Sequence, residues 1–445
     1  MENTSIQAGL KEYLVNNFND YHKLLNGISN TFFGEAKKEY FENLKVGKFP
    51  TLKTEEWKYT NINAIVKDNF IPVGLFKQDK ISGSDVNKYF FTSFDSIKLV
   101  FVNGVFDEKL SDLTKVPNDV VIKNLNKALL ENKKLVEVHF NKLVKKPDLF
   151  NVINNTFAND GLFIYVPKGK VVELPVQVLF LSGNENEKVL SLPRNMVFAD
   201  TNSELNLIVN YHGYGKSSYL NNVLTEVFVD DDARVNIYTV QDENENAFHI
   251  EKTEVYQRKR SIFSNYTFTF GGKIIRNDIG SDLQGENIEC HYFGLSLGKG
   301  EQHIDNHTFV DHAKPNCMSN ELYKGILDDR SHGVFAGKIL VQRDAQKTNA
   351  YQSNKTVLLT KQAIIDTQPQ LEIFADDVKC SHGATVGQLD ANAYFYIRSR
   401  GVSENLAKSM LIRAFATDVM ENVKIEGLRN ELNHKIFEHL QQTEI

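Results

Sequence analysis

Hydrophobic residues near the start of the chain recur at intervals of three and four, the spacing that places side chains on one side of an α-helix. The first set consists of Leu10, Leu14, Phe18, Tyr21, Leu24 and Leu25, and the second of Ala36, Tyr40, Phe41 and Leu44. Gly47 and Pro50 follow the second set, and both residue types end helices. This pattern predicts two helices before Pro50.

The spacing changes near residue 99. Leu99–Val102 is apolar, Asn103-Gly104 follows, and Val105-Phe106 is apolar again. An Asn-Gly pair in this setting predicts a β-hairpin, because a type I′ turn needs positive φ angles at both central residues. Helical spacing returns over residues 119–159, in a set formed by Leu125, Leu129, Leu130, Leu135 and Val138. We therefore expect residues 1–159 to form a mostly helical N-terminal region with a hairpin at 99–106.

Short β-type segments then follow one another from residue 160 to about residue 390. They include Leu162–Val166, Val176–Phe180, Leu205–Val209, Val235–Val240 and Phe263–Phe270. No helical pattern separates these segments, which argues against a parallel α/β sheet because its strands need helical crossovers.

A weak internal repeat lies within this β-rich region. Val197–Leu207 resembles Val227–Ile237 at an offset of 30 residues, and Ile373–Asp377 echoes the pattern. A period of this length, built of strands and corners, is typical of the stacked coils of a β-helix. An ordinary β-sandwich with coincidental similarity is the alternative.

The last part of the chain, residues 391–445, returns to helical spacing. Ser403 and Glu404 suit a helix start, because a serine caps the first turn and an acidic residue complements the helix dipole. The apolar residues that follow are Leu406, Met410, Leu411, Ala414, Phe415 and Val419, and then Leu428, Leu432, Ile436 and Leu440. We expect a helical C-terminal domain after a β-rich core at residues 160–390.

Composition narrows the class of protein. The 445 residues include 51 Lys and Arg against 57 Asp and Glu, so the net charge of −6 gives no electrostatic reason to bind nucleic acid or an anionic membrane. No apolar run approaches the ~18 residues that span a bilayer, and no secretory signal is evident. The three cysteines are too few for a disulfide scaffold. We expect a cytoplasmic protein.

Two sets of residues have the chemistry of metal ligands. Cys380 and His382 would share one face of a strand, and a thiol beside an imidazole suits iron, zinc or a cluster. Two ligands do not complete a site, so other residues or a second chain would supply the rest. His303, Asp305 and His307 form a weaker candidate. The alternatives are a half-buried pair within a sheet for the first set, and a polar outer face for the second, with Asp305 orienting a neighbouring group.

Several motifs together resemble a known family. The stretch Ala375-Asp-Asp-Val-Lys-Cys-Ser-His-Gly-Ala-Thr-Val-Gly387 is followed by Tyr394-Phe-Tyr-Ile-Arg-Ser-Arg-Gly401. Similar stretches elsewhere are Thr54–Thr60, Val102–Phe106, Asp160–Pro167, His303–Gly325 and Asp344–Gln352. On these residues the chain resembles the SufB/SufD family, whose members are subunits of the Suf machinery that assembles iron–sulfur clusters.

Two local features resemble the SufD branch of this family rather than the SufB branch. SufB proteins carry a sulfur-accepting cysteine in a Cys-Asp-Ser stretch, where this chain reads Tyr351-Gln-Ser-Asn354. They also read Glu-His-Glu-Ala-Thr where this chain reads Ser381-His-Gly-Ala-Thr385. The resemblance therefore implies a subunit that contributes to a cluster site without supplying the acceptor thiol.

The resemblance also implies an architecture and a function. The expected fold is mainly β, a right-handed parallel β-helix flanked by helical N-terminal and C-terminal regions. The expected function is a non-catalytic scaffold that pairs with SufB through the β-helices and docks the SufC ATPase on the C-terminal helices. Iron or a nascent iron–sulfur cluster would be shared with SufB and transient, with none expected stoichiometrically on the isolated chain. A flavin remains a further candidate for the bound species.

Individual residues take roles from the same resemblance. His382 matches a family histidine with a ligand or iron-entry role, and Cys380 matches a cysteine whose role is weaker. Leu406, Met410 and Phe415 are candidates for the SufC-binding surface, although packing within the chain is the alternative. Arg398 borders them and is placed to pair with carboxylates of that partner. The isolated chain is expected to be able to form a homodimer.

Two rival functions follow from the residues alone. A β-helix can carry a polysaccharide-active enzyme, which would use paired carboxylates in a long groove. An autonomous metalloenzyme would use His303, Asp305 and His307. The chain contains neither a P-loop motif nor a Gly-x-Ser-x-Gly nucleophile motif, so nucleotide hydrolysis and serine esterase chemistry are not indicated.

Overall fold

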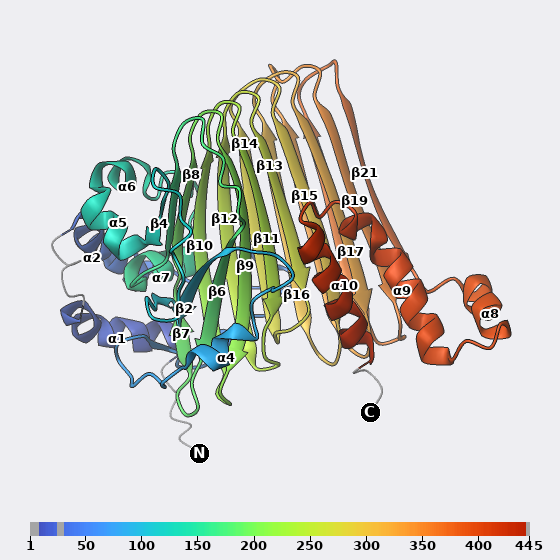
Figure 1. Cartoon of the computed structure of the whole chain (residues 1–445), viewed down its shortest axis with the longest axis horizontal. Helices are drawn as coiled ribbons and strands as arrows, with labels where there is room; N and C mark the ends of the chain where they lie inside the picture. The colour runs from blue at the N-terminus through green and yellow to red at the C-terminus, as the bar shows by residue number, and fades with distance from the viewer. Residues whose placement is uncertain (1–8, 25–30, 442–445) are drawn as a thin grey trace.

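Two long β-sheets dominate the structure, a computed structural model that describes residues 9–24 and 31–441 (Figure 1). Successive strands alternate between the sheets, and each strand of the core pairs in parallel with the strand one coil further on. The described residues form eight such coils, from β5 and β6 to β20 and β21. The core is therefore a parallel β-helix with helices on both sides, as expected, and not a β-sandwich.

Sheet A follows the strand order β20-β18-β16-β14-β12-β10-β8-β5-β4, with the short strands β7 and β1 alongside β10. Its strands are β1 (Ile71–Pro72), β4 (Val121–Asn124), β5 (Leu162–Val166), β7 (Val189–Ser191), β8 (Arg194–Ala199), β10 (Tyr219–Val229), β12 (Ala247–Gln257), β14 (Ile274–Leu283), β16 (His303–His312), β18 (His332–Val341) and β20 (Ile364–Ile373).

Sheet B follows the order β21-β19-β17-β15-β13-β11-β9-β6-β2-β3. Its strands are β2 (Ile97–Val102), β3 (Val105–Phe106), β6 (Val176–Gly183), β9 (Glu204–Tyr214), β11 (Arg234–Asp242), β13 (Ile262–Thr269), β15 (Glu289–Gly298), β17 (Met318–Leu327), β19 (Asn349–Leu358) and β21 (Lys379–Gly387).

The stacking of coils explains the sequence repeat. Val197 of β8 lies opposite Val227 of β10, at the 30-residue offset seen in the sequence. The third segment of the repeat, which begins at Ile373, is shifted by two residues from the position that the sequence pattern gives it. The ladder of paired strands places Ile373 in the column of Ala199 rather than in the column of Val197.

One corner of the β-helix repeats a left-handed residue in each of six coils. The φ angles lie between 56° and 61° at Asn202, Asp232, Arg260, Asn287, Asn316 and Lys347. The N–H of each donates to a carbonyl oxygen of the next coil, for example from Asn202 to Asp231 at 2.9 Å and from Lys347 to Asp377 at 2.6 Å. These bonds satisfy backbone groups that a sharp corner would otherwise leave unpaired.

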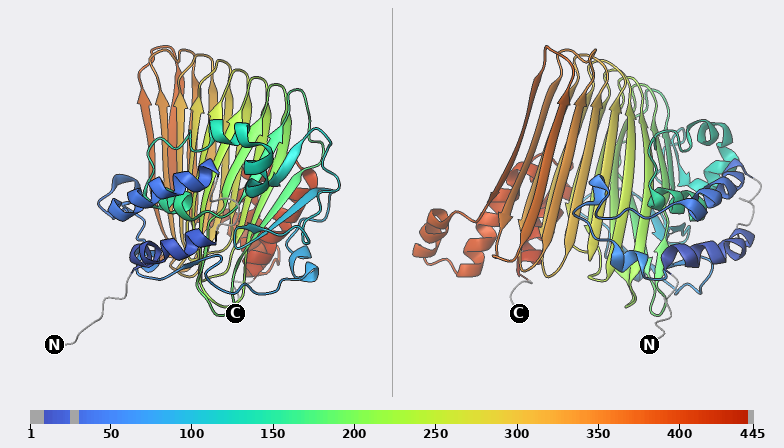
Figure 2. Two further views of the ribbon diagram at one scale, coloured as in Figure 1. Left: turned by 90° about the vertical axis from the view of Figure 1, so that its left-hand side faces the viewer. Right: turned by 180° about the vertical axis from the view of Figure 1, so that it is seen from behind.

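The N-terminal helices other than α4 (Gly83–Asn87) pack against the outer face of sheet A over the first coils, whereas α4 packs on sheet B, with Val86 in one cluster with Val100 and Leu179 (Figures 1 and 2). The longer ones are α1 (Leu10–Lys23), α2 (Phe32–Val46), α5 (Leu125–Glu131), α6 (Lys133–His139) and α7 (Leu149–Phe157), and the short ones are η1 (Glu55–Trp57), α3 (Asn63–Val66) and α4. Leu10, Leu14, Phe18 and Tyr21 are buried as their spacing predicted. Leu24 is exposed, and Leu25 lies outside the described residues.

The predicted hairpin is confirmed. Asn103 and Gly104 have φ angles of 53° and 82°, and β2 pairs antiparallel with β3 around them. The prediction of helical structure over 119–159 needs correction at its start, because Val121–Asn124 forms strand β4 against β5. Leu130 and Val138 are exposed rather than part of a buried stripe.

Three helices follow the β-helix, and they are α8 (Ala391–Ser399), α9 (Glu404–Met420) and α10 (Glu426–Gln441). α9 and α10 pack on the outer face of sheet B, whereas α8 extends away from the body (Figure 1). Leu428, Leu432 and Ile436 of α10 are buried as predicted, and the side chain of Leu440 lies outside the described residues. None of the helices in the described ranges is long and apolar enough to cross a membrane.

The buried face of α9 differs from the predicted one. The buried residues of α9 are Ala407, Ser409, Ile412, Ala416, Val419 and Met420, and the last four of these pack against sheet B. Of the predicted stripe, Val419 is buried, but Leu406 and Met410 are exposed. Both sides of α9 therefore carry apolar residues, and the side with Ile412, Val419 and Met420 is the one that packs on the sheet.

Candidate functional site

The β-helix is covered at one end and open at the other (Figure 2). At the N-terminal end, the segment between β3 and β4 closes the first coil, with Leu113 and Val116 packed against the core. At the C-terminal end, no further strand of the described ranges pairs with the outer edges of β20 and β21. Ile364, Phe374 and Val386 are exposed there. An unpaired sheet edge with exposed apolar side chains is a surface suited to binding another chain.

Cys380 and His382 both lie at this open end, on β21. Cys380 pairs with Ala350, and His382 pairs with Gln352 of β19. The Cys380 side chain packs in a small apolar cluster inside the last coil. His382 is two residues further along the strand, so its imidazole points to the same face. Because no described coil follows, His382 is exposed while facing the interior side of the β-helix.

The two side chains differ as ligands. Burial raises the pKa of the Cys380 thiol, and a metal binds the thiolate rather than the thiol. A neutral imidazole binds iron or zinc without losing a proton. His382 is therefore the stronger candidate ligand and Cys380 the weaker one.

The column of interior side chains that ends at His382 changes in character along the β-helix. From the first coils to the open end it reads Leu207, Ile237, Asn265, Tyr292, Glu321, Gln352 and His382. The first two residues are apolar, as expected for a core, but the rest carry polar groups. The polar interior thus continues from the middle coils to the open end.

Glu321 is the acidic member of this column, and it was not singled out by the sequence pattern. It is 1% exposed, and its Oε2 accepts hydrogen bonds from Thr308 Oγ1 at 2.5 Å and Gln352 Nε2 at 3.1 Å. Burial raises the pKa of Glu321 to about 7, although the two hydrogen bonds oppose the change. No local sequence pattern identifies Glu321 as part of a site, because its hydrogen-bond partners lie 13 and 31 residues away on other strands.

The C-terminal helices offer a second exposed surface. Leu406 and Met410 on α9 are 45% and 47% exposed, and Phe395 and Tyr396 on α8 are also exposed. None of the α8 residues is buried. These four apolar side chains define the α8–α9 surface.

Phe415 and Arg398 do not lie on that surface in the way the sequence suggested. Phe415 is half-buried against sheet B, where Lys324 Nζ lies 4.7 Å from its ring centre and donates to its carbonyl oxygen at 2.5 Å. Arg398 is in the last turn of α8 and donates to the carbonyl oxygen of Val402, in the α8–α9 connection, at 2.8 Å. Phe415 thus packs within the chain, and Arg398 stabilises the turn before α9.

His303, Asp305 and His307 lie on β16, where the N-terminal segment Thr54–Thr60 crosses them. Thr60 Oγ1 donates to Asp305 Oδ2 at 2.5 Å and lies 2.8 Å from His303 Nε2. Two stretches that are far apart in the sequence, and that each resemble a family motif, are therefore held together.

The positive charge in this cluster is a guanidinium. Arg276 Nη1 lies 2.7 Å from Asp305 Oδ2 and 3.1 Å from His307 Nε2, and the guanidinium stacks 3.9 Å from the ring centre of Trp57. A second cation at the same carboxylate would be repelled by Arg276. Within residues 9–24 and 31–441, no group of three or more His, Cys, Asp and Glu side chains is arranged to hold a metal ion.

The pKa values of the cluster fit this ionic arrangement. Burial alone would raise the pKa of Asp305, but the charges of His307 and Arg276 outweigh burial and lower it. Burial lowers the pKa of His303 to about 4, so this imidazole is neutral at pH 7. The geometry favours a clamp that holds the N-terminal segment on sheet A.

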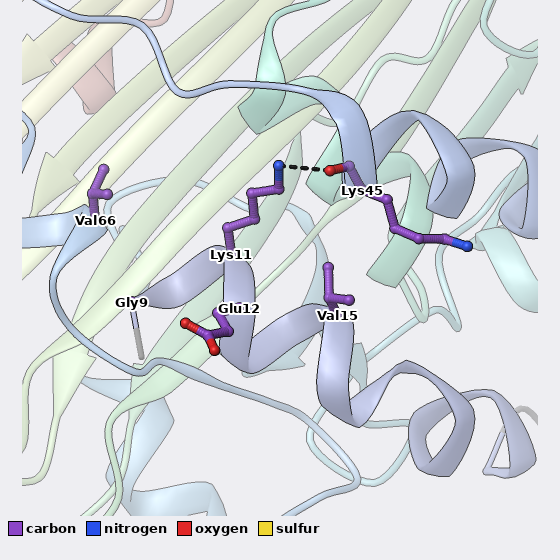
Figure 3. Close-up of a pocket in the computed structure, with 6 residues that line it drawn as sticks. All are labelled: Gly9, Lys11, Glu12, Val15, Lys45 and Val66. Atoms are coloured by element: carbon purple, nitrogen blue, oxygen red, sulfur yellow. Dashed lines mark hydrogen bonds between the residues drawn. The ribbon is translucent and has the colours of Figure 1, made fainter. Parts of the chain in front are cut away.

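A hollow of about 370 Å³ lies elsewhere, on the N-terminal helices (Figure 3). Gly9, Lys11, Glu12, Val15, Lys45 and Val66 line it, and Lys11 Nζ donates to the carbonyl oxygen of Lys45 at 2.8 Å. It contains none of the candidate ligands, so the site with metal-ligand chemistry remains the open end.

Two family models match the chain over almost its whole length. One, described as the SufBD protein N-terminal region, matches residues 9–178, and the other, described as the SUF system FeS cluster assembly SufBD core domain, matches residues 180–415. The chain belongs to the SufBD family.

Curated SufBD relatives extend the match to whole proteins. The iron–sulfur cluster assembly protein SufD of Escherichia coli is 28% identical over 427 residues, which cover 96% of this chain and 97% of that protein. An iron–sulfur cluster assembly SufBD family protein of Synechocystis is 27% identical over 393 residues, 86% of each chain. One from Mycobacterium tuberculosis is 30% identical over 246 residues, which cover 54% of this chain and 61% of that protein.

Within the SufBD family the chain is SufD-like. The stretch Tyr351–Asn354 lies on β19 and carries Gln352 at the interior position. All three cysteines of this SufBD protein are free, and Cys290 and Cys317 are buried. Burial raises the pKa of Cys290 to about 12. These thiols are protonated at neutral pH, which fits a subunit that does not accept sulfur on its own cysteines.

Proposed function

We propose that this SufBD protein is a non-catalytic scaffold subunit that pairs with SufB through its open end and docks the SufC ATPase on its C-terminal helices. Iron or a nascent iron–sulfur cluster is the cargo, held between the two β-helices. The observation that carries the proposal is the position of His382, which faces the interior at the uncovered end of the β-helix.

An incomplete site suits such cargo. His382 supplies one imidazole, and the Cys380 thiol beside it is protonated at neutral pH for the reason given above. Iron and iron–sulfur clusters need several ligands, with thiolates prominent among them, so the remaining ligands come from the partner. A site shared between two chains can release its cargo when the chains move apart.

Pairing at the open end has a clear physical basis. The outer edges of β20 and β21 present unpaired backbone N–H and C=O groups beside exposed Ile364 and Val386. A second β-helix can satisfy these groups and bury the apolar side chains. In the absence of SufB, a second copy of this chain has the same edges, so the isolated protein is expected to form a homodimer.

The α8–α9 surface supports docking of SufC. Its exposed apolar residues Leu406 and Met410 are not part of the cluster that packs α9 on the β-helix, which contains Ile412, Ala416, Val419 and Met420. Exposed apolar clusters of this kind mark sites of protein association.

The decisive experiment is cluster assembly by the complex with the variant His382→Ala. The protein is co-expressed with SufB and SufC and purified anaerobically, and iron and sulfide are measured in the complex. We expect the complex to form normally, because His382 makes no contact that holds the fold, and the cluster content to fall to background.

Ser381→Ala is the matched control. Ser381 is the neighbour of His382 on the same strand, but its side chain points to the outer face. This variant is expected to retain the cluster content of the parent complex. An unchanged cluster yield in His382→Ala, or an equal loss in both variants, would exclude the proposed role of His382.

A further inference from the structure

The interior acid Glu321 lies in an unusual setting for a carboxyl group. Its Oε2 accepts two hydrogen bonds, from Thr308 and Gln352, while its Oε1 has no hydrogen-bond partner within residues 9–24 and 31–441. The main chain of Gly337 closes the space above these groups, since a Cβ there would lie 2.3 Å from Gln352 Nε2 and 2.8 Å from Thr308 Oγ1. Glu321 is therefore enclosed by β16, β17, β18 and β19.

No charged group that faces Glu321 balances it. On β15, Cys290 and Tyr292 are neutral because burial raises the pKa of each. Tyr323, on β17 itself, has a raised pKa for the same reason. On β16, His312 binds Ser319 through Nε2 at 2.9 Å, and burial lowers its pKa to about 4. Glu321 is thus the group of this cluster that changes charge near neutral pH.

The same column connects Glu321 to the candidate ligand at the open end. Glu321 lies opposite Gln352, and Gln352 lies opposite His382. Two strand spacings of about 4.8 Å separate Glu321 from His382, a distance of about 10 Å. The intervening residue is polar, and Gln352 Oε1 has no hydrogen-bond partner among the residues that the structure describes.

This arrangement couples the two ends of the column electrostatically. A positive charge at His382 stabilises the carboxylate form of Glu321 and not the neutral acid. By linkage, the carboxylate form in turn favours binding of a cation at the open end. Neither effect needs a change in the fold.

We propose that Glu321 is a buried acid that releases its proton when positive charge binds at the open end of the β-helix. The O–H bond of the neutral carboxyl group breaks, the carboxylate remains, and the proton passes to solvent at the open end along the polar column. A cation that arrives there is in this way partly neutralised by a negative charge generated inside the protein. The inference rests on the proposed function for the identity of that cation as iron.

The test replaces the cation with a fixed charge, so that it does not depend on cluster assembly. In the isolated full-length protein with isotopically labelled glutamate, infrared spectroscopy follows the protonated carboxyl band from about pH 5 to pH 9. Glu321→Gln identifies the band. The parent protein is expected to show a carboxyl group that titrates near neutrality and is missing in Glu321→Gln.

His382→Lys then places a permanent ammonium group at the open end of the column, and Ser381→Lys places one on the outer face of the same strand. His382→Lys is expected to lower the pKa of Glu321 by roughly 0.5–1, the effect of one charge about 10 Å away in a polar, partly screened setting. Ser381→Lys is expected to shift it by much less.

Two results would overturn the proposal. One is a Glu321 band that does not change between about pH 5 and pH 9. The other is an equal shift of the band in His382→Lys and Ser381→Lys. Since neither measurement involves a cluster, failure here is distinct from an unchanged cluster yield in His382→Ala, which would remove the proposed function instead.

Discussion

At the scale of single residues, the sequence identifies candidate ligands but not their partners. Asp305 and His307 have the right chemistry for a metal face, yet imidazoles and carboxylates serve equally well around a guanidinium. Arg276 supplies the guanidinium. It lies one coil earlier, on β14, and pairs with Asp305 on β16. Arg276 and Asp305 are 29 residues apart in the sequence, so no local pattern links them. Their contact can be inferred only when the strand register is known.

Glu321 illustrates the same limit and leads to a prediction about stability. Its pKa is raised to about 7 by burial, whereas a glutamate in an unfolded chain titrates near 4.5. Below both values the group is protonated in either state and has no effect. As the pH rises from 4.5 to 7, the unfolded chain loses this proton and the folded protein keeps it, so the free energy of unfolding falls by about 3 kcal/mol.

Glu321→Gln should remove this dependence. We subtract the free energy of unfolding of the parent from that of the variant. This difference is expected to be about 3 kcal/mol larger at pH 8 than at about pH 4.5, because only the parent loses stability as the pH rises. Denaturant unfolding of both proteins at the two pH values measures the difference, and other titrating groups cancel in the comparison. An equal difference at both pH values would show that folding does not raise the pKa of Glu321.

At the scale of elements, periodicity predicts which segments are helices and strands, and it predicts the Asn103-Gly104 hairpin. It does not predict which side of a helix is buried when both sides carry apolar residues. On α9 Ile412, Val419 and Met420 pack against the sheet, whereas Leu406 and Met410 are exposed. Strand β4 was missed because it is short and runs directly into α5, and its pairing with β5 decides its conformation.

The exposed face of α9 yields a prediction about the partner. Met410→Glu places a charge in the α8–α9 surface and should weaken binding of SufC at least tenfold, because a buried unpaired carboxylate costs more than 1.4 kcal/mol at an interface. Asn405→Glu places the same charge on a different side of the same helix and is expected to bind normally. A pull-down with purified SufC, supported by circular dichroism, measures both.

Normal binding of Met410→Glu would show that SufC uses another surface. Equal loss in both variants would point instead to a general effect of negative charge on α9, and the apolar contact would not be specific.

At the scale of the whole molecule, stability is not distributed evenly. Each coil of a β-helix is held mainly by its neighbours, and the first coils also contact the N-terminal helices. The last coil, β20 and β21, has a neighbour on one side, and its side chains are mostly exposed or half-buried. The C-terminal end should therefore open first.

Hydrogen–deuterium exchange can measure this gradient. At a protein concentration where sedimentation shows a monomer, backbone amides of residues 364–387 are expected to exchange much faster than those of β10 and β12, which lie between paired strands on both sides. Addition of SufB should slow exchange in 364–387 and leave the central strands unchanged. Uniform protection along the β-helix of the monomer would contradict the idea of an open end.

The difference between the two ends also sets the stoichiometry of any assembly built on it. The N-terminal end stops in the short strands β3 and β4 and in a segment packed over the first coil, so it offers no long edge for a further chain. When two such molecules join by their open edges, each blocked end faces outward and growth stops at two. An elongated stack of β-sheets that has the geometry to polymerise would thereby be restricted to a closed pair.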